Sequence, residues 1–152
     1  MKIRIEISET EDEEVIIRCK ERTDKISHLE TVIENAVRGD SVLVLYSTGT
    51  EYYVPKKDVL FFETYDGKVC AHTKDRMYKT NHKLFELESI MPSYFVRISK
   101  SVIANAKMIN SLRRELTGNG EITFAGTDKS TYFSRGYYSI LKDKLEEMRN
   151  QK

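Results

Sequence analysis

The side chains with the widest chemical range in this sequence are three histidines and two cysteines. His28, His72 and His82 lie far apart along the chain, and Cys19 and Cys70 form no CxxC pair. Structural zinc sites combine closely spaced Cys and His ligands, and disulfide frameworks need more cysteines than two isolated ones. The spacing therefore predicts no metal site and no disulfide framework, and it favours a surface position on a helix for His28.

The common sequence signatures of catalysis and cofactor binding are missing. The sequence contains no GxxxxGK[ST], GxGxxG, HExxH or GxSxG motif, the patterns that mark phosphate, dinucleotide, zinc-protease and hydrolase sites. The acidic run at residues 9–14 could mimic a phosphate backbone, but such a block is more often a solvated turn. We expect a protein that is not an enzyme and that uses no cofactor.

Charge is distributed unevenly, although the 152 residues carry a net charge of only +1. Residues 1–64 contain nine Lys and Arg against fourteen Asp and Glu, whereas residues 65–152 contain sixteen against ten. A basic part of a chain suits a polyanion such as nucleic acid. Basic halves also occur in proteins that never meet nucleic acid, so charge alone leaves both possibilities open.

Hydropathy indicates a cytoplasmic protein. No stretch approaches the roughly 20 apolar residues that cross a bilayer, and residues 1–6 alternate charged with apolar side chains, unlike a signal peptide. We expect no contact with the membrane.

The first 40 residues predict a small β-β-α lobe. Residues 2–8 alternate isoleucine with polar residues, and residues 15–19 are rich in β-branched side chains, so the two segments are expected to pair as strands. Thr23 or Asp24 can cap a following helix whose apolar residues have 3.6-residue spacing. A glycine ends that helix, and residues 39–41 are the expected domain boundary.

The remainder of the chain predicts mostly short strands, so the fold class is mainly β with a few helices (α+β). Helices are expected at residues 83–89 and 136–148, and the segment 103–106 is too short to assign. Strands separated by Gly, Asp and Asn turns are expected at residues 42–46, 51–54, 59–64, 69–73, 77–80, 94–98, 109–116 and 121–124, with one more from residue 132.

Four segments in fixed order resemble the LytTR family, the DNA-binding domain of LytR- and AgrA-type bacterial regulators. They are VLFFE at residues 59–63, YKT with LFEL at residues 78–87, FVRISKSVIAN at residues 95–105 and FSRGY at residues 133–137. The third segment matches its family pattern throughout: an aromatic, Val, Arg, an apolar residue, two polar residues, Ser, three largely apolar residues and Asn. The resemblance implies an elongated LytTR-like β fold over residues 41–148.

The resemblance also implies how DNA would be bound. In this family, loops at one edge of the β fold enter successive major grooves, and no recognition helix is used. Matched position by position, the residues expected to contact bases are Lys100, Arg135 and Lys68. Ser101 and Asn105 are expected to support the loops through hydrogen bonds to the backbone. Without the resemblance, Lys100 and Arg135 would be taken for ordinary solvated cations.

The working hypothesis is a sequence-specific transcription factor for double-stranded DNA. It would act as a homodimer or as paired protomers on promoter repeats, with the lobe of residues 1–40 mediating dimerisation. That lobe resembles the extension of family members that lack a phosphoreceiver domain. The alternative is a protein-interaction or ligand-sensing module that does not bind DNA. Steep weakening of binding with salt would distinguish the two, because phosphate contacts release counterions.

Overall fold

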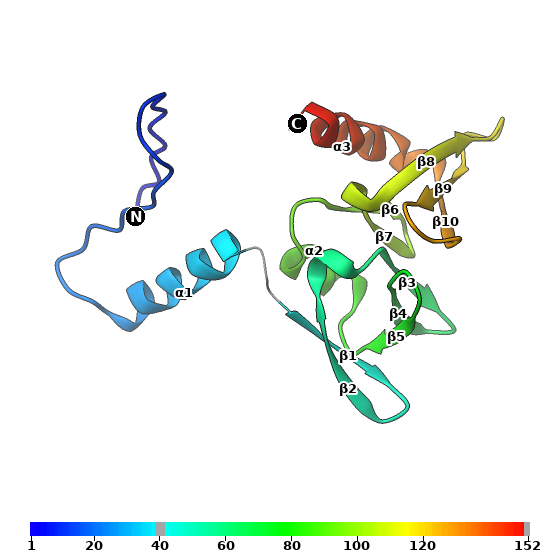
Figure 1. Cartoon of the computed structure of the whole chain (residues 1–152), viewed down its shortest axis with the longest axis horizontal. Helices are drawn as coiled ribbons and strands as arrows, with labels where there is room; N and C mark the ends of the chain where they lie inside the picture. Colours follow the sequence, from blue (N-terminus) through cyan, green and yellow to red (C-terminus); the bar gives the residue numbers. More distant parts are fainter. Residues whose placement is uncertain (39–41, 151–152) are drawn as a thin grey trace. The chain divides into compact units, whose positions relative to one another are not determined.

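The computed structural model of the protein describes residues 1–38 and 42–150 (Figure 1). The chain divides into two compact units, Met1–Glu34 and Asn35–Lys152. The boundary expected at residues 39–41 lies outside the described residues. None of the described helices is long and apolar enough to cross a membrane.

Helix α1 (Asp24–Arg38) starts in the first unit. The described residues before it contain no other helix or strand. Thr23 caps it as expected, because its Oγ1 accepts a hydrogen bond from the N–H of Ile26 at 3.3 Å. Ile26, Leu29 and Ile33 are partly buried and form the apolar side of the helix. The helix of the expected front lobe is therefore confirmed.

The two strands expected in the front lobe are absent, so that part of the prediction was wrong. Residues 1–23 contain no strand. Ile3, Ile5 and Ile7 are 92%, 83% and 94% exposed, so nothing in the described chain covers their apolar face. A two-stranded hairpin without a layer packed against it is marginal in water.

The second unit contains ten strands and two α-helices among its described residues. The strands β1 to β10 are Val42–Ser47, Thr50–Pro55, Phe61–Tyr65, Lys68–His72, Met77–Thr80, Phe95–Ser99, Val102–Asn105, Ile109–Arg114, Gly120–Phe124 and Ser130–Phe133. The helices are α2 (Leu84–Ile90) and α3 (Tyr138–Asn150), with short 3-10 helices η1 (Lys56–Asp58), η2 (Ala106–Met108) and η3 (Arg135–Tyr137). The mainly β fold class with a few helices is confirmed.

The strands form two antiparallel sheets. The larger has seven strands in the order β2-β1-β5-β4-β3-β7-β6, and the smaller has three in the order β10-β9-β8. Figure 1 shows the β1–β2 hairpin at one end of the unit and the small sheet with α3 at the other. Strands β3 and β7 pair in the interior of the large sheet, where both of its faces are covered.

Each face of the large sheet has its own apolar core. Phe62 and Ile103 point to the face covered by α2, where Leu87 completes the core. Phe61 points to the opposite face, where it joins Leu141 of α3 and residues of the small sheet. Successive residues of a strand point to opposite faces, so two adjacent phenylalanines serve two cores.

Two of the predicted hairpin turns have the expected backbone geometry. Thr48 and Gly49 have φ of 48° and 78°, and Asp66 and Gly67 have φ of 51° and 72°. Positive φ at both central residues defines the type I′ turn, whose twist matches that of the paired strands. The second of these turns delivers Lys68 to the start of β4.

Candidate nucleic-acid interface

Lys100 lies in the turn between β6 and β7, and its side chain is exposed. Arg97 of β6 holds this turn: its Nε donates to the carbonyl oxygen of Ser99 at 2.8 Å, and its guanidinium also donates to the carbonyl oxygen of Lys100. The same guanidinium binds Glu88 of α2, with 2.6 Å between Nη1 and Oε1. Because the Arg97 guanidinium is planar and donates to three acceptors at once, it fixes the direction of the turn. Arg97 therefore anchors the Lys100 turn to α2.

A backbone hydrogen bond joins the Lys100 turn to the β3–β4 hairpin. The N–H of Thr64 donates to the carbonyl oxygen of Ser101 at 2.9 Å. The next residue of β3, Tyr65, pairs with Lys68 of β4 in the antiparallel register. Lys68 is exposed, so the structure brings Lys68 and Lys100 to the same end of the large sheet.

Arg135 reaches that same end from the other sheet. It is the first residue of η3, one residue beyond the end of β10, and its side chain is exposed. The preceding residue, Ser134, donates its backbone N–H to the carbonyl oxygen of Ile98 at 2.9 Å. Ile98 lies two residues before Lys100 in the chain. Three loops that carry the expected cations are therefore neighbours.

The charges of these three loops are not neutralised inside the described part of the protein. Lys68, Lys100 and Arg135 take part in none of the ion pairs among the described residues. Exposed cations in a cluster raise the local concentration of an anionic ligand. The arrangement is suited to a phosphate backbone and to the acceptor atoms of bases.

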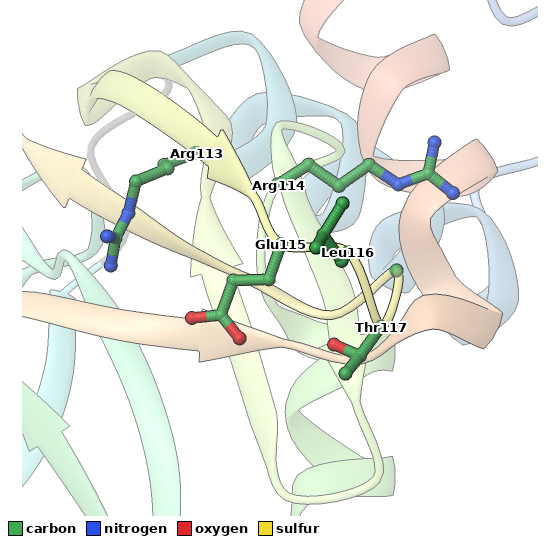
Figure 2. Close-up of a pocket in the computed structure, with 6 residues that line it drawn as sticks. Arg113, Arg114, Glu115, Leu116 and Thr117 are labelled. Atoms are coloured by element: carbon green, nitrogen blue, oxygen red, sulfur yellow. The ribbon is translucent and has the colours of Figure 1, made fainter.

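The β8–β9 hairpin contacts Arg135 through Gly118 and Asn119. It adds two more arginines, Arg113 and Arg114 (Figure 2). Arg113 and Arg114 extend from it in different directions, and its tip carries the fully exposed Leu116. The guanidinium carbon of Arg114 lies 4.0 Å from the centroid of the Tyr138 ring at the start of α3. Arg113 is 3.6 Å from Glu121 of β9, so part of its charge is offset.

The supporting residues expected from the sequence lie at opposite ends of β7. The hydroxyl of Ser101 lies 3.4 Å from that of Ser99, so both serines belong to the Lys100 turn. Asn105 is buried, and its Nδ2 donates to the carbonyl oxygens of Val59 at 2.9 Å and Lys57 at 3.3 Å. Asn105 therefore bonds to the backbone, but to the segment that leads into β3 and not to the Lys100 turn.

A line of polar contacts ties the large sheet to the β9–β10 turn. His72 Nε2 lies 2.7 Å from Glu63 Oε1, and Lys129 Nζ lies 3.5 Å from His72 Nδ1. Lys129 Nζ also donates to the carbonyl oxygen of Arg76 at 2.6 Å. Burial lowers the pKa of His72, and this outweighs the opposite influence of Glu63. A neutral imidazole that donates from Nε2 and accepts at Nδ1 satisfies both neighbours.

Metal ligands are not assembled in the part of the chain that the structure describes. No three His, Cys, Asp or Glu side chains there come close enough to hold a metal ion. Cys19 is exposed, Cys70 is buried, and both are free thiols. Burial raises the pKa of the Cys70 thiol, which favours its neutral form.

Arg97 and Asn119 support these loops, and neither role was predicted from the sequence. Arg97 belongs to the motif at residues 95–105, so its place in the motif was a usable signal. Asn119 accepts a hydrogen bond from the backbone N–H of Arg135, with 2.8 Å between Oδ1 and N. Nothing in a turn sequence indicates which distant segment its side chain will bind.

Comparison with known proteins places this chain in a family. The chain matches the LytTr DNA-binding domain family over residues 50–146. It is also similar to the LytTr DNA-binding domain of a protein from Bacillus cereus, with a TM-score of 0.65, 23% identity and coverage of 70% of this chain and 98% of that one. That structural likeness supports the fold. The chain therefore belongs to the LytTR DNA-binding domain family, and DNA is the ligand class that this membership assigns to it.

Two relatives match nearly the whole chain. One is an HTH-type transcriptional regulator of Staphylococcus aureus (strain bovine RF122 / ET3-1), 32% identical over 149 residues, covering 95% of this chain and 98% of the relative. The other is an HTH-type transcriptional regulator of Staphylococcus aureus (strain NCTC 8325 / PS 47), 31% identical over 147 residues with the same coverage. The similarity to these relatives therefore extends into the first unit.

Proposed function

We propose that this protein is a bacterial transcriptional regulator that reads double-stranded DNA in the major groove through the loops of Lys68, Lys100 and Arg135. The observation that carries the proposal is the pair of backbone hydrogen bonds, from Thr64 to Ser101 and from Ser134 to Ile98, that gathers the three loops at one end of the large sheet. The proposed contacts use side chains alone and need no cofactor. DNA in a bacterial cell lies in the cytoplasm, and we place the protein there.

The three cations have different proposed roles, because arginine and lysine side chains differ in the hydrogen bonds they can make. Arg135 can donate two parallel hydrogen bonds to O6 and N7 of guanine, so it is the proposed base reader. A lysine ammonium can reach the same atoms or a phosphate oxygen, so Lys68 and Lys100 contribute both to orientation and to affinity. Exposed side chains on turns can enter a groove, because the turns project beyond the strands that hold them.

Loops are better placed than helices for this task in the described part of the protein. Its three α-helices are each separated from the next by several strands, so no two consecutive elements form a helix-turn-helix. Helix α2 packs Leu84 and Leu87 into the core and α3 packs Leu141 into it. Both helices serve mainly as supports for the sheet.

The experiment that tests this function compares specific with random DNA. Bound sequences are first selected from a random duplex library, and affinities are then measured by fluorescence anisotropy. Arg135→Ala should cost about 1–3 kcal/mol on the selected duplex and relax the preference at one base position. Arg149→Ala, which removes another exposed arginine, is the control and should retain the preference. Equal losses on selected and random duplexes would remove Arg135 from the base-reading role.

The same measurements test the alternative function. A protein-interaction or ligand-sensing module would show no duplex binding that weakens steeply with salt. Wild-type affinity that is unchanged between about 50 and 200 mM salt would therefore count against DNA as the ligand.

Assembly is the second part of the proposal: residues 1–40 mediate homodimerisation, so that two copies occupy repeated promoter sites. Support comes from the exposed apolar stripe of Ile3, Ile5 and Ile7 in a unit that has little core of its own. A groove in the same unit has apolar walls from Val15, Ile17 and Ile33. A second copy of the chain would cover apolar surface that is otherwise left in water.

A further inference from the structure

The β8–β9 turn is a compact hairpin end that contacts Arg135 through Gly118 and Asn119. The N–H of Gly118 donates to the carbonyl oxygen of Glu115 at 3.0 Å, and the N–H of Glu115 donates to that of Asn119 at 2.8 Å. Gly118 is buried and has φ of +89°, a conformation that residues with a side chain rarely adopt. The turn is thus closed by its own backbone.

Asn119 holds the backbone of Arg135. Its side-chain Oδ1 accepts the N–H of Arg135 at 2.8 Å across 16 positions of sequence. Arg135 opens η3, and the first N–H groups of a helix lack partners within the helix. The amide of Asn119 supplies that partner and fixes the point from which the Arg135 side chain leaves the chain.

Gly118 holds the side chain of Arg135. A Cβ placed on Gly118 would lie 2.6 Å from Cδ and 2.7 Å from Cγ of Arg135, closer than atoms can approach. The aliphatic stem of Arg135 therefore rests directly on the backbone of the turn, and only glycine leaves space for it. A stem packed in this way has fewer rotamers to lose when the guanidinium binds.

The far side of η3 is held by the same hairpin. Arg114 of β8 stacks on Tyr138, with 4.0 Å between the guanidinium carbon and the ring centroid. A cation over a tyrosine ring is an attractive contact. The β8–β9 hairpin therefore contacts Arg135, the first residue of η3, and Tyr138, the first residue of α3.

We propose that the β8–β9 turn is the positioning device for Arg135, with Gly118 and Asn119 as specificity-determining residues that do not touch the DNA themselves. The inference rests on the proposed function, because it concerns how the base-reading arginine is held. A bidentate contact requires the two guanidinium nitrogens to meet two base atoms together. Gly118 and Asn119 set that geometry before DNA arrives, which reduces the entropy lost on binding.

The decisive experiment compares two glycines with similar backbone geometry. Gly49 has φ of +78° and nothing within 4 Å of a built Cβ, so Gly49→Ala introduces similar backbone strain without touching any arginine. Gly118→Ala should lower affinity for the selected duplex by about 5- to 100-fold, approaching the loss of a bidentate contact, and flatten the preference at the base that Arg135 reads. Gly49→Ala should leave both quantities unchanged.

Asn119→Ala provides a second route if Gly118→Ala does not fold, and it should shift the same base preference by a smaller factor. Both variants are repeated with Arg135→Ala, where neither should reduce specificity further. An effect of Gly118→Ala no larger than that of Gly49→Ala, or one that persists in the Arg135→Ala background, would overturn the positioning role. If Arg135→Ala alone leaves base preference intact, the proposed function fails first and the positioning role with it.

Discussion

Two segments of this chain were both expected to form strands, and only one of them does. Residues 2–8 place isoleucine at every second position and form no strand, with Ile5 83% exposed. Strand β1 (Val42–Ser47) is a run of apolar residues in which exposed and buried positions alternate over the first four, and its Leu45 is fully buried. The difference is the partner: β1 lies between β2 and β5 and over a core, whereas the front segment has neither. An alternating pattern predicts a strand only where a second layer exists to receive its apolar face.

The largest expected effect is on the stability of the second unit. Leu45→Ala should lower the free energy of unfolding by about 2–5 kcal/mol, because it opens a cavity in a closed core. Ile5→Ala, the comparison change in the first unit, should cost less than about 0.5 kcal/mol at a protein concentration too low for dimers, because that side chain is in water in the single chain. Chemical denaturation measures both. A comparable loss for Ile5→Ala at that concentration would mean that the isoleucine stripe is packed against another part of its own chain.

Removal of the first unit separates assembly from DNA contact. Deletion of residues 1–40 should lower the mass measured by light scattering by more than the deleted segment, since we propose that these residues hold two copies together. Binding to a single half-site should remain within about twofold, because the three loops are intact and each carries its own contacts. An identical monomeric mass before and after the deletion would reject the dimerisation role.

A smaller expected effect is on the pH dependence of stability. It arises from His72, which contacts Glu63 and Lys129. Burial lowers the pKa of His72, so the unfolded chain takes up a proton at a higher pH than the folded chain does. Stability from this residue is present above about pH 6.5 and is lost as the pH falls below that value. Thermal denaturation between pH 7 and pH 5 should therefore show a shallower decline for His72→Gln than for the wild type.

The control for that experiment is His28→Gln, which changes an exposed histidine of α1 and should keep the wild-type pH dependence. An unchanged slope for His72→Gln would show that protonation of His72 does not limit stability in this range.

The sequence predicted most of the second unit because its strands are short runs rich in apolar and β-branched residues, and several of the turns between them carry glycine. It could not assign β7 (Val102–Asn105), because four residues are too few to show a period, and the structure buries all four of them. It overpredicted the front strands, because local pattern carries no information about whether a covering layer is present. In both cases tertiary contacts, and not local preference, decided the outcome.

The candidate site was predictable to the extent that it follows a motif. Lys100 and Arg135 were identified from short segments, and the structure brings their loops together through Ile98 and Ser134. The support by Asn119 and Gly118 was not predictable, because it joins residues far apart in sequence and depends on the absence of a Cβ. Asn105 bonds to the backbone as expected, but its partners lie just before β3 and not in the Lys100 turn.

The most direct test of the proposed DNA interface removes the same amount of positive charge from the three loops and, in a second variant, from the first unit. One variant replaces Lys68, Lys100 and Arg135 with alanine, and a matched variant replaces three exposed lysines of the first unit, which are Lys2, Lys20 and Lys25. Both remove three positive charges, and affinity for the selected duplex is measured across salt concentrations. The loop variant should bind about 100-fold or more weakly with a shallower salt dependence, while the first-unit variant stays within about twofold. Equal losses in the two variants would contradict the claim that the loops, and not net charge, bind DNA.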